Sequence, residues 1–171
     1  MDASLNRRVL IAVDANVLLD LVEQVEDVTD AMTVIRQRLP DSQMVLPPTV
    51  GQELADEVRR GRDERRRQRA RRAFQFARNW RIQPVDLLAV KHGIAERIGS
   101  HLRETGLLPE EEVHDALILA EAALLDCSLL LTSDEHLRGV DFERLSFELQ
   151  RFDVTVPVVA TPREIVRKFF R

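Results

Sequence analysis

Several residue types are scarce in this 171-residue chain, and each scarcity excludes a class of protein. The single cysteine, Cys127, permits no internal disulfide, so we expect a buried structural thiol. The chain has no tyrosine and only 5% aromatic residues, so a platform that stacks nucleic-acid bases is not expected. No segment approaches the roughly 18 consecutive apolar residues that a membrane-spanning helix requires. We therefore expect a soluble, cytoplasmic protein.

The amino terminus superficially resembles a secretion signal, because Arg7 and Arg8 precede an apolar run. Asp14, Asn16 and Asp20 interrupt that run and no small-residue cleavage site follows it, so no signal peptide is predicted. The length favours one domain over residues 1–171, large enough to bury about 70% of its unfolded surface without disulfides.

Charge is distributed unevenly along the chain. The net charge is -4, yet residues 59–72 carry nine arginines against two acids, a local charge of +7. This Arg-rich segment, within a helical region at about 50–80, can present a basic stripe on an otherwise acidic protein.

Short apolar runs alternate with helical patterns, which predicts a three-layer α/β/α fold with a central, mainly parallel sheet. Strands are predicted at 9–14, 44–46, 128–132 and 154–159, where Pro157 favours an edge position. Helices are predicted at 15–24, 28–39, 49–78 with a bend or break at Gly61, 86–104 with Val90 on its apolar side, 109–124, 142–152 and after Pro162.

Four acidic residues stand where a metal site would require them. Asp14 and Asp134 follow apolar strands, and parallel sheets bind ligands at the carboxyl ends of their strands. Asp115 lies on the apolar helix before the second of these strands, and Glu53 lies in the first turns of the helix after Pro48. Carboxylates at the edge of a core are costly unless compensated, so the four together predict a divalent-cation site.

Each of these acids has an ordinary structural interpretation when taken alone. Asp14 suits a helix N-cap and Asp134 an Asx turn, whereas Glu53 suits the first turn of a helix. Asp115 could occupy an exposed helix position. The convergence of all four is what favours the metal site.

Neutral polar groups accompany the acids. Asn16, Thr132 and Ser133 could orient the carboxylates, bind a phosphate oxygen or hold water. A site of oxygen ligands favours Mg²⁺ or Mn²⁺ over zinc. The flanking His114 and His136 are expected to be surface or support residues. Glu112, one helical turn before Asp115, is either an additional acid at the site or a helix-start residue.

The ordered segments VDANVLLDL, QEL, HDALILAEA and LLLTSDEHL resemble the PIN-domain nucleases. The later VTVPVVATPREIV is similar to that family's closing strand and Thr-Pro-capped helix. The resemblance implies a metal-dependent ribonuclease whose active site is carried over onto Asp14, Glu53, Asp115 and Asp134. Because the family includes toxins of bacterial toxin–antitoxin pairs, it also implies an antitoxin partner and a homodimer. The region 59–104 is longer and richer in arginine than in compact members.

The arginine stripe leaves two functions open. Arg59, Arg60, Arg66, Arg67 and Arg71 could follow an RNA backbone through salt-sensitive contacts, or could pair with acidic groups instead. The alternative function is a non-catalytic PIN-like module that binds RNA or a protein through this segment. A phosphatase of the phosphoaspartyl type is disfavoured, because Asn16 stands where it would need a second aspartate.

Overall fold

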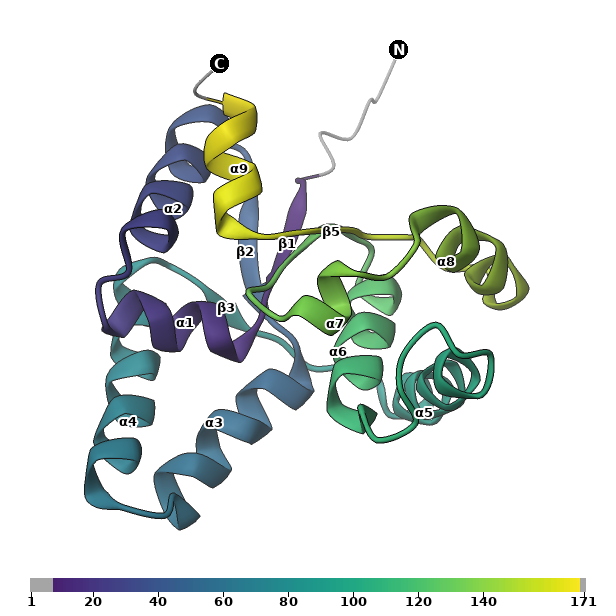
Figure 1. Ribbon diagram of the computed structural model, residues 1–171, viewed down its shortest axis with the longest axis horizontal. Coiled ribbons are helices and arrows are strands. Elements are labelled where there is room, and N and C mark those ends of the chain that lie inside the picture. Colours follow the sequence, from purple (N-terminus) through teal and green to yellow (C-terminus); the bar gives the residue numbers. More distant parts are fainter. Residues whose placement is uncertain (1–7, 170–171) are drawn as a thin grey trace.

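A computed structural model describes residues 8–169 as a parallel sheet with helices on both sides (Figure 1). Within those residues the strands are β1 (Leu10–Val13), β2 (Gln43–Leu46), β3 (Gln83–Pro84), β4 (Cys127–Leu131) and β5 (Val158–Ala160). Their order across the sheet is β3-β2-β1-β4-β5, and every neighbouring pair is parallel. The predicted three-layer architecture is therefore confirmed, with a sheet that is wholly parallel.

Helices connect the strands and cover both faces of the sheet. They are α1 (Ala15–Val22), α2 (Glu26–Arg38), α3 (Pro48–Arg60), α4 (Glu64–Asn79), α5 (Ala89–Glu104), α6 (Val113–Leu124), α7 (Glu135–Arg138), α8 (Phe142–Leu149) and α9 (Pro162–Phe169), with a 3-10 turn η1 at Gln150–Phe152. Helix α2 packs against α9, and α5 packs against α6. Between residues 8 and 169, no helix is both long enough and apolar enough to cross a membrane.

The two central strands place the first residues that follow them side by side. Ile11 pairs with Leu129 and Val13 with Leu131 in the β1–β4 ladder, and all of β1 after Leu10 is fully buried. Just beyond the ladder, the backbone N–H of Asp14 donates to the carbonyl oxygen of Leu131 at 3.0 Å. Strand β1 has β2 on one side and β4 on the other, so the strand order reverses here, and the carboxyl ends of parallel strands at such a point are where ligands usually bind.

Some predicted strands and helices have different boundaries. The last strand begins at Val158 rather than at residue 154, although its edge position is confirmed. The pair Gln83–Pro84 was not predicted as a strand, because two exposed residues carry no apolar pattern. Val90 was predicted on the apolar side of its helix, but it is 72% exposed. It is the second residue of α5, which begins at Ala89, and its side chain does not join the core.

The helix predicted from Pro109 begins later, at Val113. Its four preceding residues form turns, in which the Glu112 N–H donates to the Pro109 carbonyl at 3.1 Å. Glu110 and Glu111 therefore lie before the helix and not in its first turn. As a result, Asp115 occupies that first turn.

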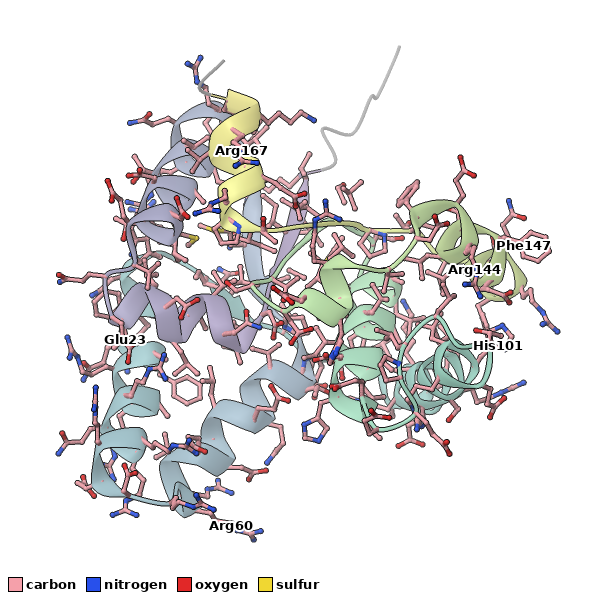
Figure 2. All side chains as sticks on the ribbon, in the orientation of Figure 1. Glu23, Arg60, His101, Arg144, Phe147 and Arg167 are labelled. Carbon is pink, nitrogen blue, oxygen red and sulfur yellow. The ribbon has the colours of Figure 1, made fainter. Side chains whose placement is uncertain are left out.

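Helices α3 and α4 form an arm that extends away from the sheet, with Arg60 near its tip (Figures 1 and 2). The break between them lies at Gly61, where an added Cβ would meet the Glu57 carbonyl oxygen at 2.5 Å. Asp63 then caps α4 by accepting from the Arg66 N–H at 2.8 Å. The helical region predicted from 49 to 78 is thus two helices, as the glycine indicated.

A buried carboxylate fastens this arm to the rest of the protein. Glu121, in the last turn of α6, is 3% exposed and accepts hydrogen bonds from the backbone N–H and hydroxyl of Thr49, at 3.0 and 2.7 Å. Thr49 lies in the first turn of α3, where backbone N–H groups lack partners within the helix. Glu121 therefore joins α6 to α3, the helices that carry Asp115 and Glu53.

Replacement of Glu121 by alanine should destabilise the protein by about 1–3 kcal/mol, because both Thr49 donors lose their acceptor. The measurement is the free energy of unfolding in urea. Glu96→Ala, an exposed carboxylate on α5, should change that free energy by less than about 0.5 kcal/mol. Equal effects of the two substitutions would contradict the role given to Glu121.

Candidate metal centre

Asp14 is the buried anchor of the carboxylate cluster. It is 3% exposed, and its Oδ1 accepts from the Ala15 N–H at 2.6 Å, which caps α1. Its Oδ2 accepts from the Thr132 hydroxyl at 2.7 Å and the Asn16 side-chain amide at 3.1 Å. The pKa of Asp14 is raised to about 6, chiefly by burial and also by the charges of Glu53 and Asp134, while the hydrogen bonds from Thr132 and Ala15 oppose the shift.

The predicted support residues connect the two strand ends. Thr132 is fully buried, and its hydroxyl oxygen accepts from the Asp134 N–H at 3.0 Å while donating to Asp14. The Asn16 side-chain oxygen accepts from the Ser133 N–H at 2.9 Å. Ser133 thus contributes its backbone amide. These bonds fix Asp14 and Asp134 relative to each other across the β1–β4 junction.

Asp134 begins the short helix α7. Its Oδ1 accepts from the N–H groups of His136 and Leu137, at 2.7 and 3.1 Å. The Asx-type interpretation and the metal-site interpretation are therefore compatible, since one carboxylate oxygen makes the cap. The same holds for Asp14, which both caps α1 and belongs to the cluster.

Asp115 is the acid whose carboxylate is least compensated by its surroundings. Its Oδ2 atom is buried and has no hydrogen-bond partner among the residues that the structure describes. Burial raises its pKa to about 8, and the charges of Asp134, Asp14 and Glu112 add to this shift. A carboxylate oxygen in such a place fits a cation ligand, because a cation would offset both the desolvation and the like-charge repulsion.

Glu53 lies at the rim of the cluster. Its Oε1 pairs with Nδ1 of the exposed His114 at 2.7 Å. Burial raises the pKa of Glu53, and the His114 contact opposes this shift. All four predicted acids therefore lie close enough for each to affect at least one other electrostatically.

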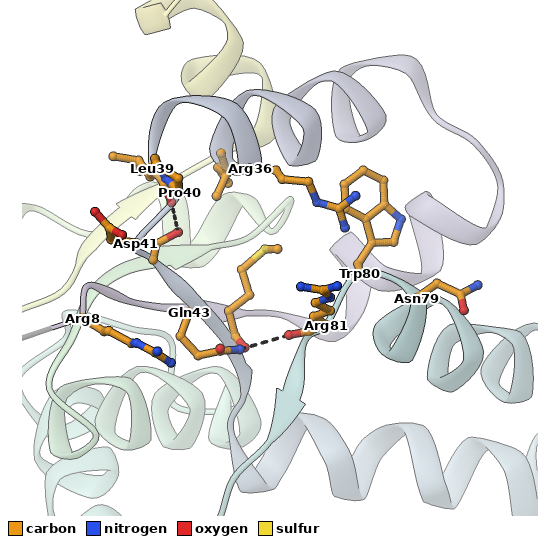
Figure 3. Close-up of a pocket in the computed structure, with 12 residues that line it drawn as sticks. Arg8, Arg36, Leu39, Pro40, Asp41, Gln43, Asn79, Trp80 and Arg81 are labelled. Atoms are coloured by element: carbon orange, nitrogen blue, oxygen red, sulfur yellow. Dashed lines mark hydrogen bonds between the residues drawn. The ribbon is translucent and has the colours of Figure 1, made fainter.

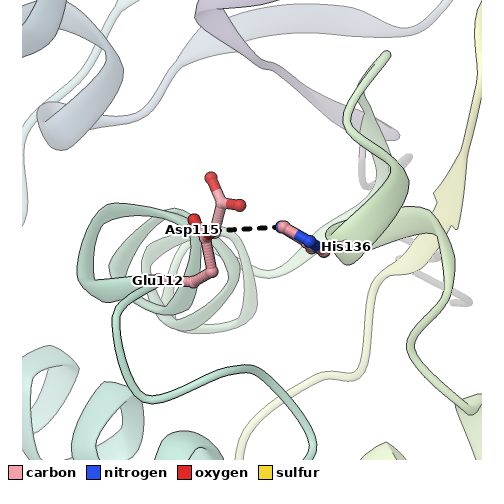
Figure 4. Close-up of side chains that lie close together, drawn as sticks. All are labelled: Glu112, Asp115 and His136. Carbon is pink, nitrogen blue, oxygen red and sulfur yellow. Dashed lines mark ion pairs between the residues drawn. The ribbon is translucent and has the colours of Figure 1, made fainter.

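Two further side chains stand beside Asp115. Glu112 and His136 place one donor atom each within 4.8 Å of one another and of an Asp115 oxygen (Figure 4). Sequence reasoning left Glu112 undecided between the site and a helix start. His136 was expected to be a surface or support residue, and its side chain is 54% exposed. Only the fold shows that both face Asp115.

The predicted RNA-contacting arginines fall into two groups. Arg67 and Arg71 bond to Glu64, each with a nitrogen to oxygen distance of 3.0 Å, so intramolecular pairing occupies them. Arg59, Arg60 and Arg66 are exposed and make no ion pair within residues 8–169. The free basic surface is therefore near the tip of the arm.

A separate cavity of about 540 Å³ lies at the opposite end of the sheet (Figure 3). Arg8, Gln43 and Arg81 line it, and the Arg36 guanidinium carbon lies 4.2 Å from the Trp80 ring centroid. Gln43 begins β2, so this cavity adjoins the amino ends of the strands. It includes none of the four acids and is distinct from the candidate metal centre.

Comparison with known proteins agrees with the fold. The PIN domain family profile matches residues 11–143, so the chain belongs to the PIN domain family. Its fold is similar to a chain in the crystal structure of VapBC2 from Rickettsia felis bound to a DNA fragment from their promoter. That likeness has a TM-score of 0.59 and 13% identity over 89% of this chain and 98% of that chain. No curated protein matches the sequence.

The cost of charging Asp115 predicts a pH-dependent stability. The folded protein keeps this carboxyl protonated up to about pH 8, whereas the ordinary pKa is 3.8. The free energy of unfolding should therefore fall as the pH rises between these values. Asp115→Asn removes the effect, and solvent screening limits the gain at pH 8 to about 1–2 kcal/mol.

The measurement is urea unfolding of both proteins with a chelator at pH 4, 6 and 8. The free energy of unfolding of the variant should be nearly equal to that of the wild type at pH 4. It should exceed the wild-type value by a growing margin as the pH rises to 8. A constant gap between them across this range would contradict the assignment.

Proposed function

We propose that this chain is a Mg²⁺- or Mn²⁺-dependent endoribonuclease that hydrolyses RNA phosphodiester bonds. The observation that carries this proposal is the buried oxygen of Asp115, which has no hydrogen-bond partner among the described residues. It lies close to Asp14, whose own pKa is raised. PIN domains are generally nucleases that use divalent cations. An acidic site would repel RNA without such a cation, so the metal and the substrate belong to one proposal.

The side chains have distinct proposed roles. Asp14, Asp115 and Asp134 would hold the cation directly, and Glu53 would hold it directly or through water. Thr132 and Asn16 keep the Asp14 carboxylate in one orientation, as their hydrogen bonds indicate. When bound, a divalent cation supplies the positive charge that activates water and offsets the charge of the phosphodiester.

The arm formed by α3 and α4 is the proposed RNA contact. Its exposed arginines would contact phosphates without sequence preference. Glu53 lies on the same helix as Arg59 and Arg60, so RNA held along α3 would approach the carboxylates. The structural neighbour of this chain belongs to a VapBC2 complex. On that basis we propose a toxin that pairs with a small antitoxin and forms a homodimer; a small reading frame upstream of its own would support this.

Substitution of a proposed metal ligand should abolish metal-dependent RNA cleavage. Asp14→Asn and Asp115→Asn should each lower the cleavage rate in Mg²⁺ or Mn²⁺ at least about a hundredfold, because each removes a charged ligand. The measurement is cleavage of an RNA panel with and without chelator, beside thermal unfolding of each variant.

Glu135→Gln is the matched control, since it removes one exposed negative charge next to Asp134. Unchanged cleavage by pure, folded Asp14→Asn would refute the proposed role. RNA binding without metal-dependent cleavage by the wild type would favour the non-catalytic module instead.

Neutralising the free arginines should weaken RNA binding in a salt-dependent way. The triple variant Arg59→Gln, Arg60→Gln, Arg66→Gln should make the negative slope of log affinity against log salt shallower by about 2. This corresponds to ~0.7 for each of the three phosphate contacts removed. The measurement is fluorescence anisotropy with single-stranded RNA in chelator. Arg163→Gln, which pairs with Asp27 away from the arm, should leave the slope unchanged.

A further inference from the structure

The group formed by Glu112, Asp115 and His136 brings a nitrogen donor to the edge of the carboxylate cluster. Nδ1 of His136 lies 3.1 Å from the Glu112 Oε1 atom (Figure 4). The same nitrogen lies 4.0 Å from Oδ1 of Asp134. The three candidate donor atoms of the group lie within 4.8 Å of one another. The His136 imidazole therefore lies beside the carboxylates of Glu112, Asp115 and Asp134.

The Glu112 carboxylate does not cap the helix that it precedes. Glu112 is the N-cap residue of α6, yet its side chain makes no capping hydrogen bond. Its partly buried carboxylate instead faces His136, which lies on α7 after β4. A helix-start role is thus insufficient to explain where this side chain points.

Asp115 supplies the second, independent observation. Its buried Oδ2 atom is without a hydrogen-bond partner in the described part of the chain. A buried oxygen of this kind usually has a partner such as a hydrogen-bond donor, a water or an ion. With Glu112 and His136 beside it, a cation position would have both oxygen and nitrogen ligands.

We propose that Glu112, Asp115 and His136 form a mixed oxygen–nitrogen cation position that favours a first-row transition-metal dication, such as Mn²⁺, over Mg²⁺. The inference rests on the proposed metal centre and specifies its metal preference. Mg²⁺ is a hard cation that takes oxygen ligands and keeps much of its water. An imidazole nitrogen binds first-row transition metals better than Mg²⁺, so a histidine ligand raises the affinity for these metals relative to that for Mg²⁺.

A purely electrostatic role for His136 predicts the opposite result. If His136 only neutralised the acids as an imidazolium, it would repel any cation, and its removal would strengthen the binding of Mn²⁺ and Mg²⁺ alike. If it is a ligand, its removal weakens Mn²⁺ binding selectively. The two roles are therefore distinguished by the sign of one measured change.

The experiment measures metal binding by the intact chain without RNA. Mn²⁺ affinity is read from the electron paramagnetic resonance signal of free Mn²⁺, and Mg²⁺ affinity from competition with Mn²⁺. His136→Asn should weaken Mn²⁺ binding about tenfold and Mg²⁺ binding less than about twofold, whereas Glu112→Gln should weaken both. His92→Asn is the control, because His92 pairs with Asp86 away from the acids.

Unchanged or stronger Mn²⁺ binding by folded His136→Asn would overturn the inference. That result leaves the proposed nuclease intact if Mg²⁺-dependent RNA cleavage persists in the wild type. Conversely, a selective loss of Mn²⁺ binding in a protein that cleaves no RNA would support the cation position and overturn the proposed function. Thermal unfolding of each variant with chelator verifies that the fold is retained.

Discussion

The parallel pairing of β1 with β4 is the constraint on which the candidate site depends. It places Asp14 directly beside the end of β4, where the Thr132 hydroxyl donates to its carboxylate at 2.7 Å. The same hydroxyl oxygen accepts from the Asp134 N–H, so one buried threonine connects both strand ends. The pairing of the strands therefore fixes the positions of Asp14 and Asp134. Glu53 on α3 and Asp115 on α6 lie near this pair of carboxylates.

This arrangement concentrates like charge at the edge of a packed core. Burial is the largest cause of the raised pKa of both Asp14 and Asp115, and neighbouring carboxylates increase each shift. The surrounding hydrogen bonds engage both carboxylate oxygens of Asp14 and Oδ1 of Asp134. They leave one oxygen of Asp115 without a partner among the described residues. The protein thus bears an electrostatic cost that a bound cation would relieve, which connects the stability of the fold to the chemistry proposed for it.

The positions of β1 and β4 followed from the sequence because they depend on local patterns. The apolar run before Asp14 and the run before Thr132 predicted β1 and β4, and the order of short motifs indicated the PIN domain family. Other features escaped prediction because they depend on distant contacts. The strand Gln83–Pro84 has no apolar pattern and forms only by pairing with β2. Glu121 in ILAEAALL differed from its apolar neighbours, yet only the packing of α6 on α3 shows that it caps a helix.

The sequence by itself determined the α/β class, the four candidate acids and the polar residues beside them, because each follows from composition or from spacing along one element. The tertiary structure alone decided which side chains meet. It added Glu112 and His136 to the neighbourhood of Asp115, and it separated the arginines paired with Glu64 from those left free on the arm. The physical reason is that charge and coordination depend on distances of a few ångströms between residues far apart in the chain, and those distances are set only when the helices pack on the sheet.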